Sequence, residues 1–177
     1  GGTVVDDSDA PSLTVIAVVL CAWCALGTTT YMRSRVRQSD FALWRDAADK
    51  APQKPRPWIN LALALEQAGD LDQAMRAHQT ALALSFQPRL TEYQQRFSAL
   101  ASETNIARVL AITGQETAAK RMLDDVITKA PLFAHARWNR AVLLARLGRC
   151  EDGLPDAQLA KQLDASFQEF ACAPGSR

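Results

Sequence analysis

Residues able to carry out catalysis are sparse in this chain. The two histidines, His78 and His135, lie far apart, and there is no H-x-x-x-H pair, no G-x-S-x-G motif and no phosphate-binding glycine loop. Acidic pairs at 124–125 and 151–152 are most simply the solvent-exposed faces of helices. The sequence therefore predicts no catalytic residues, no metal site and no cofactor, and we expect this chain not to be an enzyme.

The four cysteines form two pairs. Cys21 and Cys24 make a C-x-x-C motif inside an apolar run, and no His follows it, which excludes haem attachment. A disulfide there would strain a regular helix, so we expect these two to be small packing residues. A bridge between Cys150 and Cys172 would close a loop of about 22 residues, stabilise the fold by roughly 3 kcal/mol and persist only outside the cytoplasm. The sequence leaves this second pair open between the bridged and the free form.

A further set of residues recurs at fixed spacing. Three asparagines are each followed two residues later by alanine, five residues later by leucine and nine residues later by glycine. The glycine would end a helix, because it adopts a left-handed cap without strain. The alanine, and a very small residue five positions beyond the glycine, would let a second helix cross closely. The three sets are Asn60, Ala62, Leu65, Gly69 and Ala74; Asn105, Ala107, Leu110, Gly114 and Ala119; and Asn139, Ala141, Leu144, Gly148 and Gly153.

This spacing resembles that of the tetratricopeptide repeat family, whose unit is two helices in about 34 residues. Asn105 and Asn139 are one such unit apart, and Asn60 and Asn105 are one unit plus an insertion of about 11 residues apart. The resemblance runs from about Asp40 to Phe167 and implies an all-α helical-hairpin solenoid of about three and a half repeats. The expected segments are a basic junction and orphan capping helix over 33–54, a first repeat over 55–88, an insertion over 89–99, a second repeat over 100–133, a third repeat over 134–167 and a tail over 168–177.

Two of these segments depart from a regular repeat. The insertion most simply extends the first helix of the second repeat, over Leu90–Thr113. The overhang of that helix would be either a contact surface or a solvated extension, and it carries Tyr93, Arg96 and Phe97. The orphan helix matches only the second-helix pattern, at Trp44, Ala47 and Pro52.

The resemblance also assigns a role to the asparagines, since their position faces the concave groove of tetratricopeptide repeats. Asn60, Asn105 and Asn139 resemble the asparagine ladder of O-linked N-acetylglucosamine transferase and the asparagine of chaperone-binding carboxylate clamps. There the side-chain amides hold the backbone of an extended peptide, because an amide both donates and accepts hydrogen bonds. The alternative is that the asparagines bond neighbouring helices.

Other polar residues stand near the same face. Arg56, Arg108, His135 and Trp138 occupy or adjoin groove-facing positions, either as further ligand contacts or as solvated or packed side chains. Arg137 and Arg140 flank Asn139; they would form a basic patch for a carboxylate or pair with nearby acids.

The N-terminal part differs from the rest in charge. After a polar segment over 1–11, the residues 12–32 carry no charge and are about as long as a membrane-spanning helix. A signal peptide is the alternative, but acidic residues precede the run instead of basic ones. We therefore expect a single transmembrane helix over 12–32. Arg33, Arg35 and Arg37 follow it, so the positive-inside rule directs the repeats toward the cytoplasm.

The junction between this run and the repeats is similar to that of polytopic O-mannosyltransferase-like membrane proteins with C-terminal tetratricopeptide repeats. The similarity covers residues 28–62 and rests on Arg37, Leu43, Trp44, Pro52, Arg56, Asn60 and Leu61. It implies repeats on the extracytoplasmic side, against the local charge rule. The multi-span catalytic half of that class is absent, so any glycosyltransferase activity would belong to a longer polypeptide or to a multi-span partner.

Composition and charge narrow the function further. The chain is 48% hydrophobic and 7% aromatic, and its net charge of +1 indicates no nucleic-acid partner. The expectation is a membrane-anchored scaffold that binds a protein or extended peptide in its groove. The alternatives are a docking or regulatory tail of a membrane glycosyltransferase and an accessory subunit of a larger membrane complex.

Overall fold

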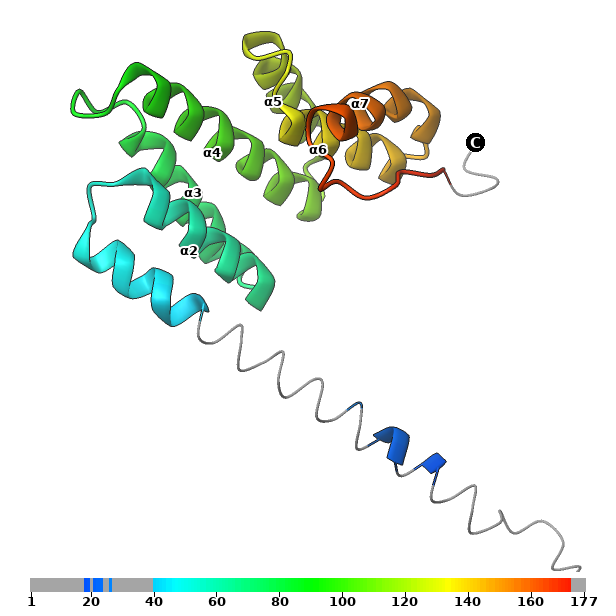
Figure 1. The fold of residues 1–177 in the computed structure, drawn as a ribbon, viewed down its shortest axis with the longest axis horizontal. Coiled ribbons are helices and arrows are strands. Elements are labelled where there is room, and N and C mark those ends of the chain that lie inside the picture. Colours follow the sequence, from blue (N-terminus) through cyan, green and yellow to red (C-terminus); the bar gives the residue numbers. More distant parts are fainter. Residues whose placement is uncertain (1–17, 20, 24–25, 27–39, 173–177) are drawn as a thin grey trace, which may run out of the picture. The chain divides into compact units, whose positions relative to one another are not determined.

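The computed structural model describes residues 18–19, 21–23, 26 and 40–172. The chain divides into two compact units, Gly1–Asp40 and Phe41–Arg177. Every regular element among the described residues is an α-helix, and none of these residues forms a strand (Figure 1). The described part of the protein is therefore all-α, as the composition and spacing predicted.

The predicted transmembrane helix over 12–32, and with it the single-pass membrane localisation, is contradicted. Crossing a bilayer needs about 20 consecutive apolar residues in one helix. In the part of the chain that the structure describes, no helix combines the necessary length with the necessary apolarity. The longest helix that it bounds, Glu92–Ile112, has 21 residues but is interrupted by charged side chains. Most of 12–32, Cys24 included, and all of 1–11 and 33–39 lie outside the described residues.

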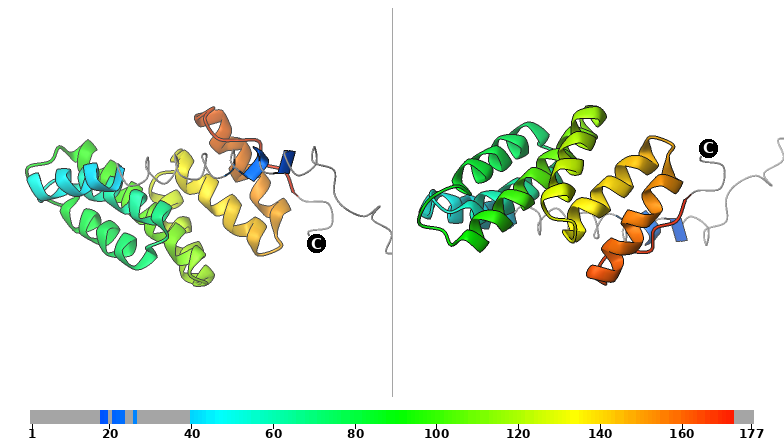
Figure 2. Two further views of the ribbon diagram at one scale, coloured as in Figure 1. Left: turned by 90° about the horizontal axis from the view of Figure 1, so that it is seen from below. Right: turned by 90° about the horizontal axis from the view of Figure 1, so that it is seen from above.

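The second unit is a series of helical hairpins. Residues 40–50 are helical and are followed by α2 (Pro55–Ala68), α3 (Leu71–Leu84), α4 (Glu92–Ile112), α5 (Glu116–Lys129), α6 (Ala134–Arg146) and α7 (Cys150–Leu163). The pairs α2/α3, α4/α5 and α6/α7 each pack together, and each pair packs against the next (Figures 1 and 2). The first helices also contact one another, α2 with α4 and α4 with α6. The unit is therefore a helical repeat in which the first helices lie side by side.

Glycine ends the first helix of each pair, as predicted. Gly69, Gly114 and Gly148 have φ angles of 85°, 83° and 73°, in the left-handed region that favours glycine. The residue after each glycine donates its backbone N–H to the carbonyl of the repeat leucine, at Leu65, Leu110 or Leu144, over 2.8–2.9 Å. This is the hydrogen bond of a Schellman cap, and it turns the chain into the second helix.

The small residues lie where the paired helices cross. Ala62, Ala107 and Ala141 on the first helices and Ala74 and Ala119 on the second helices are all fully buried. In the last pair, glycine stands at the position of the second alanine, at Gly153. A Cβ atom at Gly153 would lie 2.9 Å from the carbonyl oxygen of Ala141.

The two irregular segments also have defined places. Helix α4 begins at Glu92, two residues after the predicted start, with Thr91 and Gln94 forming a capping box. At 21 residues it is longer than α2, which has 14. The helix at 40–50 packs Phe41 and Trp44 against the α2/α3 core, where Ala48 is fully buried.

Candidate functional site

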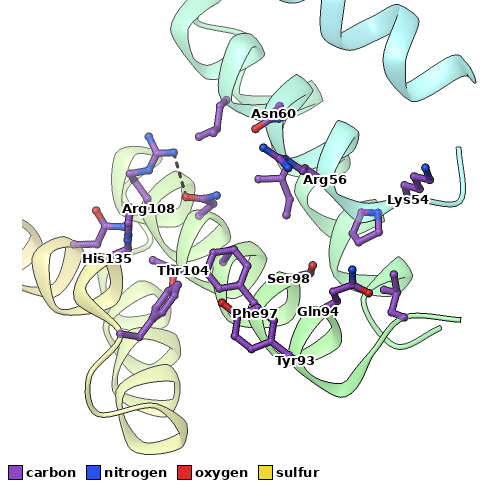
Figure 3. A pocket seen from close by; sticks show the side chains of 18 residues that line it. Lys54, Arg56, Asn60, Tyr93, Gln94, Phe97, Ser98, Thr104, Arg108 and His135 are labelled. Atoms are coloured by element: carbon purple, nitrogen blue, oxygen red, sulfur yellow. Dashed lines mark hydrogen bonds between the residues drawn. The ribbon is translucent and has the colours of Figure 1, made fainter. Parts of the chain in front are cut away.

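The candidate site is a groove of about 1040 Å³ (Figure 3). It is bounded by the first helix of each hairpin, α2, α4 and α6, and by the segments that precede these helices. Equivalent positions of these helices point to the same side because the hairpins repeat in register. Six of the seven predicted groove residues line it, and they are Asn60, Asn105, Asn139, Arg56, Arg108 and His135. The seventh, Trp138, does not line the groove.

The asparagines are the most specific part of the lining. The chain contains no asparagine other than Asn60, Asn105 and Asn139, so all of them line one groove. All three side chains are half-buried. Asn105 accepts a hydrogen bond from Arg108 over 3.4 Å, within its own helix. The amides of Asn60 and Asn139 have no side-chain hydrogen-bond partner among the described residues, so they do not bond neighbouring helices.

The charge of the lining is one-sided. It contains Lys54, Arg56, Arg108 and His135 and no aspartate or glutamate. Lys54 and Arg56 are exposed and have no ion-pair partner in the described part of the chain. The groove end formed by the start of α2 therefore carries two uncompensated positive charges (Figure 3).

Arg108 differs from these two because it is paired beneath the groove surface. Its guanidinium makes a two-point contact with the carboxylate of Glu66, at 2.7 and 3.0 Å. Glu66 also lies 2.7 Å from Nε2 of His78, which is fully buried. The cluster joins α2, α3 and α4, so Arg108 is held in position by the fold. His78, one of the two histidines, is thus a packing residue of this cluster and lies outside the groove lining.

An aromatic row forms one wall of the groove. The rings of Tyr93 and Phe97 are stacked with centroids 6.2 Å apart, and Phe97 meets the edge of Phe133 at 6.1 Å. Tyr93 is 76% exposed and Phe97 52% exposed. Two members, Tyr93 and Phe97, lie on the helix overhang for which a contact surface and a solvated extension were the alternatives, whereas Arg96 there donates to the carbonyl of Lys129. Sequence reasoning missed Phe133, which precedes α6 and belongs to no repeated position.

Trp138 lies instead under the C-terminal segment. Phe167 stacks on its ring at 5.0 Å with an interplanar angle of 24°, and Phe170 meets it edge-on at 5.7 Å. Cys150 and Cys172 are joined by a disulfide, which attaches this segment to the start of α7. The pair that the sequence left open is therefore bridged in the structure.

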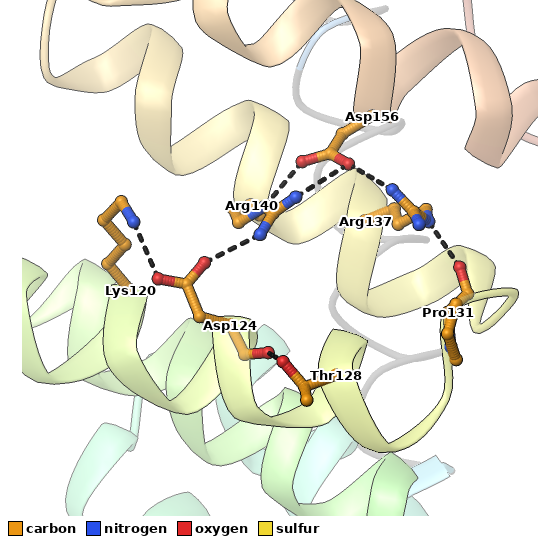
Figure 4. Close-up of polar contacts among 7 residues, drawn as sticks. All are labelled: Lys120, Asp124, Thr128, Pro131, Arg137, Arg140 and Asp156. Atoms are coloured by element: carbon orange, nitrogen blue, oxygen red, sulfur yellow. Dashed lines mark hydrogen bonds and ion pairs between the residues drawn. The ribbon is translucent and has the colours of Figure 1, made fainter.

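The two arginines beside Asn139 bind acids on the second helices (Figure 4). Asp156, which is 4% exposed, is contacted by Arg137 at 2.7 Å and by two nitrogens of Arg140 at 2.6 and 3.0 Å. A third nitrogen of Arg140 binds Asp124 at 2.7 Å, and Asp124 also binds Lys120. Of the two alternatives for these arginines, the structure shows pairing with nearby acids.

This network shifts the pKa values of Asp124 and Arg140. Desolvation raises the pKa of Asp124, but hydrogen bonds from Lys120 and Arg140 outweigh it and hold the pKa below its usual value. The hydrogen bond to Asp156 raises the pKa of Arg140 further above its ordinary value, against the opposing effect of desolvation. The guanidinium groups of Arg137 and Arg140 are thus engaged by carboxylates of the protein itself.

Comparison with known proteins adds no family to this description. Neither protein-family models nor curated proteins give a match to the chain. Within the described residues, no three His, Cys, Asp or Glu side chains are placed to hold a metal ion. The arrangement is a largely apolar groove whose lining also carries three asparagine amides and cationic side chains but no carboxylate.

Proposed function

We propose that this helical-repeat unit binds an extended peptide in the groove bounded by α2, α4 and α6, in the manner of tetratricopeptide repeat proteins. Asn60, Asn105 and Asn139 would hold the peptide backbone through their amides. The observation that carries the proposal is that all the asparagines of the chain line one groove, with two of the three amides unpaired among the described residues.

The chemistry of the lining favours an acidic peptide with apolar side chains. Lys54 and Arg56 are exposed cations, and the lining offers no carboxylate that would repel a negative ligand. The wall formed by Tyr93, Phe97 and Phe133 offers aromatic surface for apolar side chains. Charged rims of this kind increase the association rate and the selectivity of binding more than its affinity.

Helix energetics separate this function from a purely structural role. Asparagine is less favourable than alanine inside a helix by roughly 0.5 kcal/mol. Replacing all three by alanine should therefore leave the melting temperature unchanged or raise it. Each lost amide–peptide hydrogen bond should cost binding about 0.5–1.5 kcal/mol, so the triple variant should bind roughly ten- to a thousandfold more weakly.

The test is binding of the full chain to an array of acidic, neutral and basic extended peptides, with and without the triple alanine substitution. The control variant replaces three exposed amides of the second helices, Gln79, Gln158 and Gln162, by alanine. The proposal expects acidic peptides to be selected, and their binding to fall only in the asparagine variant. If the asparagine and glutamine variants bind alike, the ladder is not the binding element. Loss of binding in Tyr93→Ala alone would instead place the contact on the α4 overhang.

A further inference from the structure

The C-terminal segment is a stretch of chain without regular secondary structure that packs against α6, one of the helices that line the groove. After α7 ends at Leu163, a short turn is closed by the N–H of Ser166, which donates to the carboxylate of Asp164 over 2.9 Å. Residues 168–172 then have no regular secondary structure and end at the disulfide. In Figure 1 this segment, in red, follows α7 and returns past α6.

Its contacts are those of a ligand with two aromatic anchors. Phe167 stacks on Trp138 and also meets the ring of His135 edge-on, with centroids 5.2 Å apart. Phe170 meets the same indole edge-on. Between the two phenylalanines, Glu169 forms an ion pair with Lys161 of α7. The segment thus has an acidic residue between two half-buried phenylalanines that contact Trp138.

The surface beneath it is continuous with the groove. His135 lines the groove and touches Phe167, and Asn139, which also lines the groove, is the neighbour of Trp138 on α6. The aromatic row runs without interruption from Tyr93 on α4 through Phe133 and His135 to the segment. On α6 the protein's own chain therefore contacts His135 and Trp138, whereas Asn139 lines the groove beside them.

We propose that Trp138 and His135 form an aromatic-binding subsite at the α6 end of the groove, filled in this structure by residues 164–172 as an internal ligand. The external ligand of this subsite is an extended acidic peptide with phenylalanine side chains, of the kind that the segment itself represents. This inference rests on the proposed function of the groove. It adds the side-chain class that the ligand carries and a competitor that the ligand must displace.

Tethering explains why the subsite is closed. A short linker holds an internal ligand at a local concentration in the millimolar range. Here the segment is tethered at both ends, by the peptide bond after Leu163 and by the disulfide at Cys172. A free peptide of equal intrinsic affinity would therefore bind the intact protein weakly, and binding should appear once the internal anchors are removed.

The experiment uses the segment as its own probe. A fluorescein-labelled peptide D-A-S-F-Q-E-F, the sequence of residues 164–170, is titrated by fluorescence anisotropy into the full oxidised chain. The proteins compared are wild type, the F167A/F170A variant, and that variant with Trp138→Ala or His135→Ala added. His135 is exposed, so its substitution keeps the test valid if Trp138→Ala disturbs folding, and thermal melts accompany each variant.

The expected result is at least tenfold tighter binding by the F167A/F170A variant than by wild type. Adding either Trp138→Ala or His135→Ala should reverse the gain, and the peptide D-A-S-A-Q-E-A should not bind. Equal binding to wild type and F167A/F170A, or binding that survives both subsite substitutions, overturns the proposal. Because the asparagines are intact in every variant, such a failure would leave the ladder test, and the proposed function, to be judged separately.

Discussion

The buried carboxylate of Asp156 offers the sharpest test of how the two helices of the last hairpin, α6 and α7, are held together. It lies on α7 and receives three hydrogen bonds from Arg137 and Arg140 of α6, all at 2.6–3.0 Å. Asp156→Ala removes the acceptor and leaves two cationic side chains at a helix interface. Those side chains are only 17% and 23% exposed, so water replaces the lost contacts incompletely.

The expected loss in free energy of unfolding on Asp156→Ala follows from how deeply the ion pairs are buried. Removing one partner of a buried ion pair typically destabilises a protein by about 3–5 kcal/mol. Arg140 keeps its contact with Asp124, and both arginines are partly exposed, which places the expected loss near the lower limit, at about 2–3 kcal/mol. For a unit of this size that corresponds to a fall in melting temperature of about 6–15 °C.

Asp152→Ala is the matched control. Asp152 is on the same helix and contacts Arg149 at 2.7 Å, but its side chain is 54% exposed and that of Arg149 is 58% exposed. Loss of the Asp152 carboxylate should lower the free energy of unfolding by about 0.5 kcal/mol. Thermal and urea unfolding of both variants, with a double-mutant cycle between Asp156 and Arg137, measure the difference. Equal effects of the two substitutions, or no coupling in the cycle, would refute the argument that burial makes this network stabilising.

Three other outcomes follow from the same structure. Gly153→Ala should lower the free energy of unfolding by about 1 kcal/mol in urea unfolding, because the added methyl group overpacks against the backbone of Ala141 by more than the gain in helix propensity. A variant more stable than wild type would show that α6 and α7 can move apart to accommodate the methyl group. The pKa of Asp124 is lower in the folded than in the unfolded state, so ionised Asp124 adds to the free energy of unfolding at pH values above its unfolded-state pKa. This contribution is lost as the pH falls through the folded-state pKa. In urea unfolding, Asp124→Asn should therefore reduce the difference in free energy of unfolding between pH 7 and pH 3. Reducing the disulfide between Cys150 and Cys172 should lower the free energy of unfolding by about 3 kcal/mol in a calorimetric comparison with the oxidised chain, and an unchanged melt would contradict a stabilising role.

The repeated features of the fold were predictable from the sequence because they depend on local geometry. A left-handed cap requires glycine, so Gly69, Gly114 and Gly148 mark helix ends without knowledge of distant residues. Close crossing requires a small side chain, which made Ala62 and Gly153 recognisable. Because the hairpin repeats, these glycines and small residues recur at a fixed spacing in the sequence. The asparagines keep a constant spacing to them, which predicted that all three lie on the same face of the repeat unit.

Features that occur once were not predictable in the same way. The pairing of Trp138 with Phe167 depends on a segment beyond the last repeat, folded back through a disulfide that the sequence left undecided. Asp156 occupies no repeated acidic position, so nothing indicated that it would be buried beneath two arginines. The apolar run at 12–32 was assigned a transmembrane helix from length and charge alone, and among the described residues no helix is both long and apolar enough to cross a membrane.

The energetics of the asparagines give the strongest reason to look for function in the groove. Each occupies a helix interior where alanine would be more stable, at a combined cost of about 1.5 kcal/mol. No side-chain hydrogen bond of Asn60 or Asn139 to the described residues offsets that cost, and Asn105 accepts a single bond of 3.4 Å. Residues that weaken local stability without a compensating contact are expected where a protein binds or reacts. Since all three lie on one surface that also lacks carboxylates, the compensating contacts are expected from a ligand that supplies backbone hydrogen bonds and negative charge.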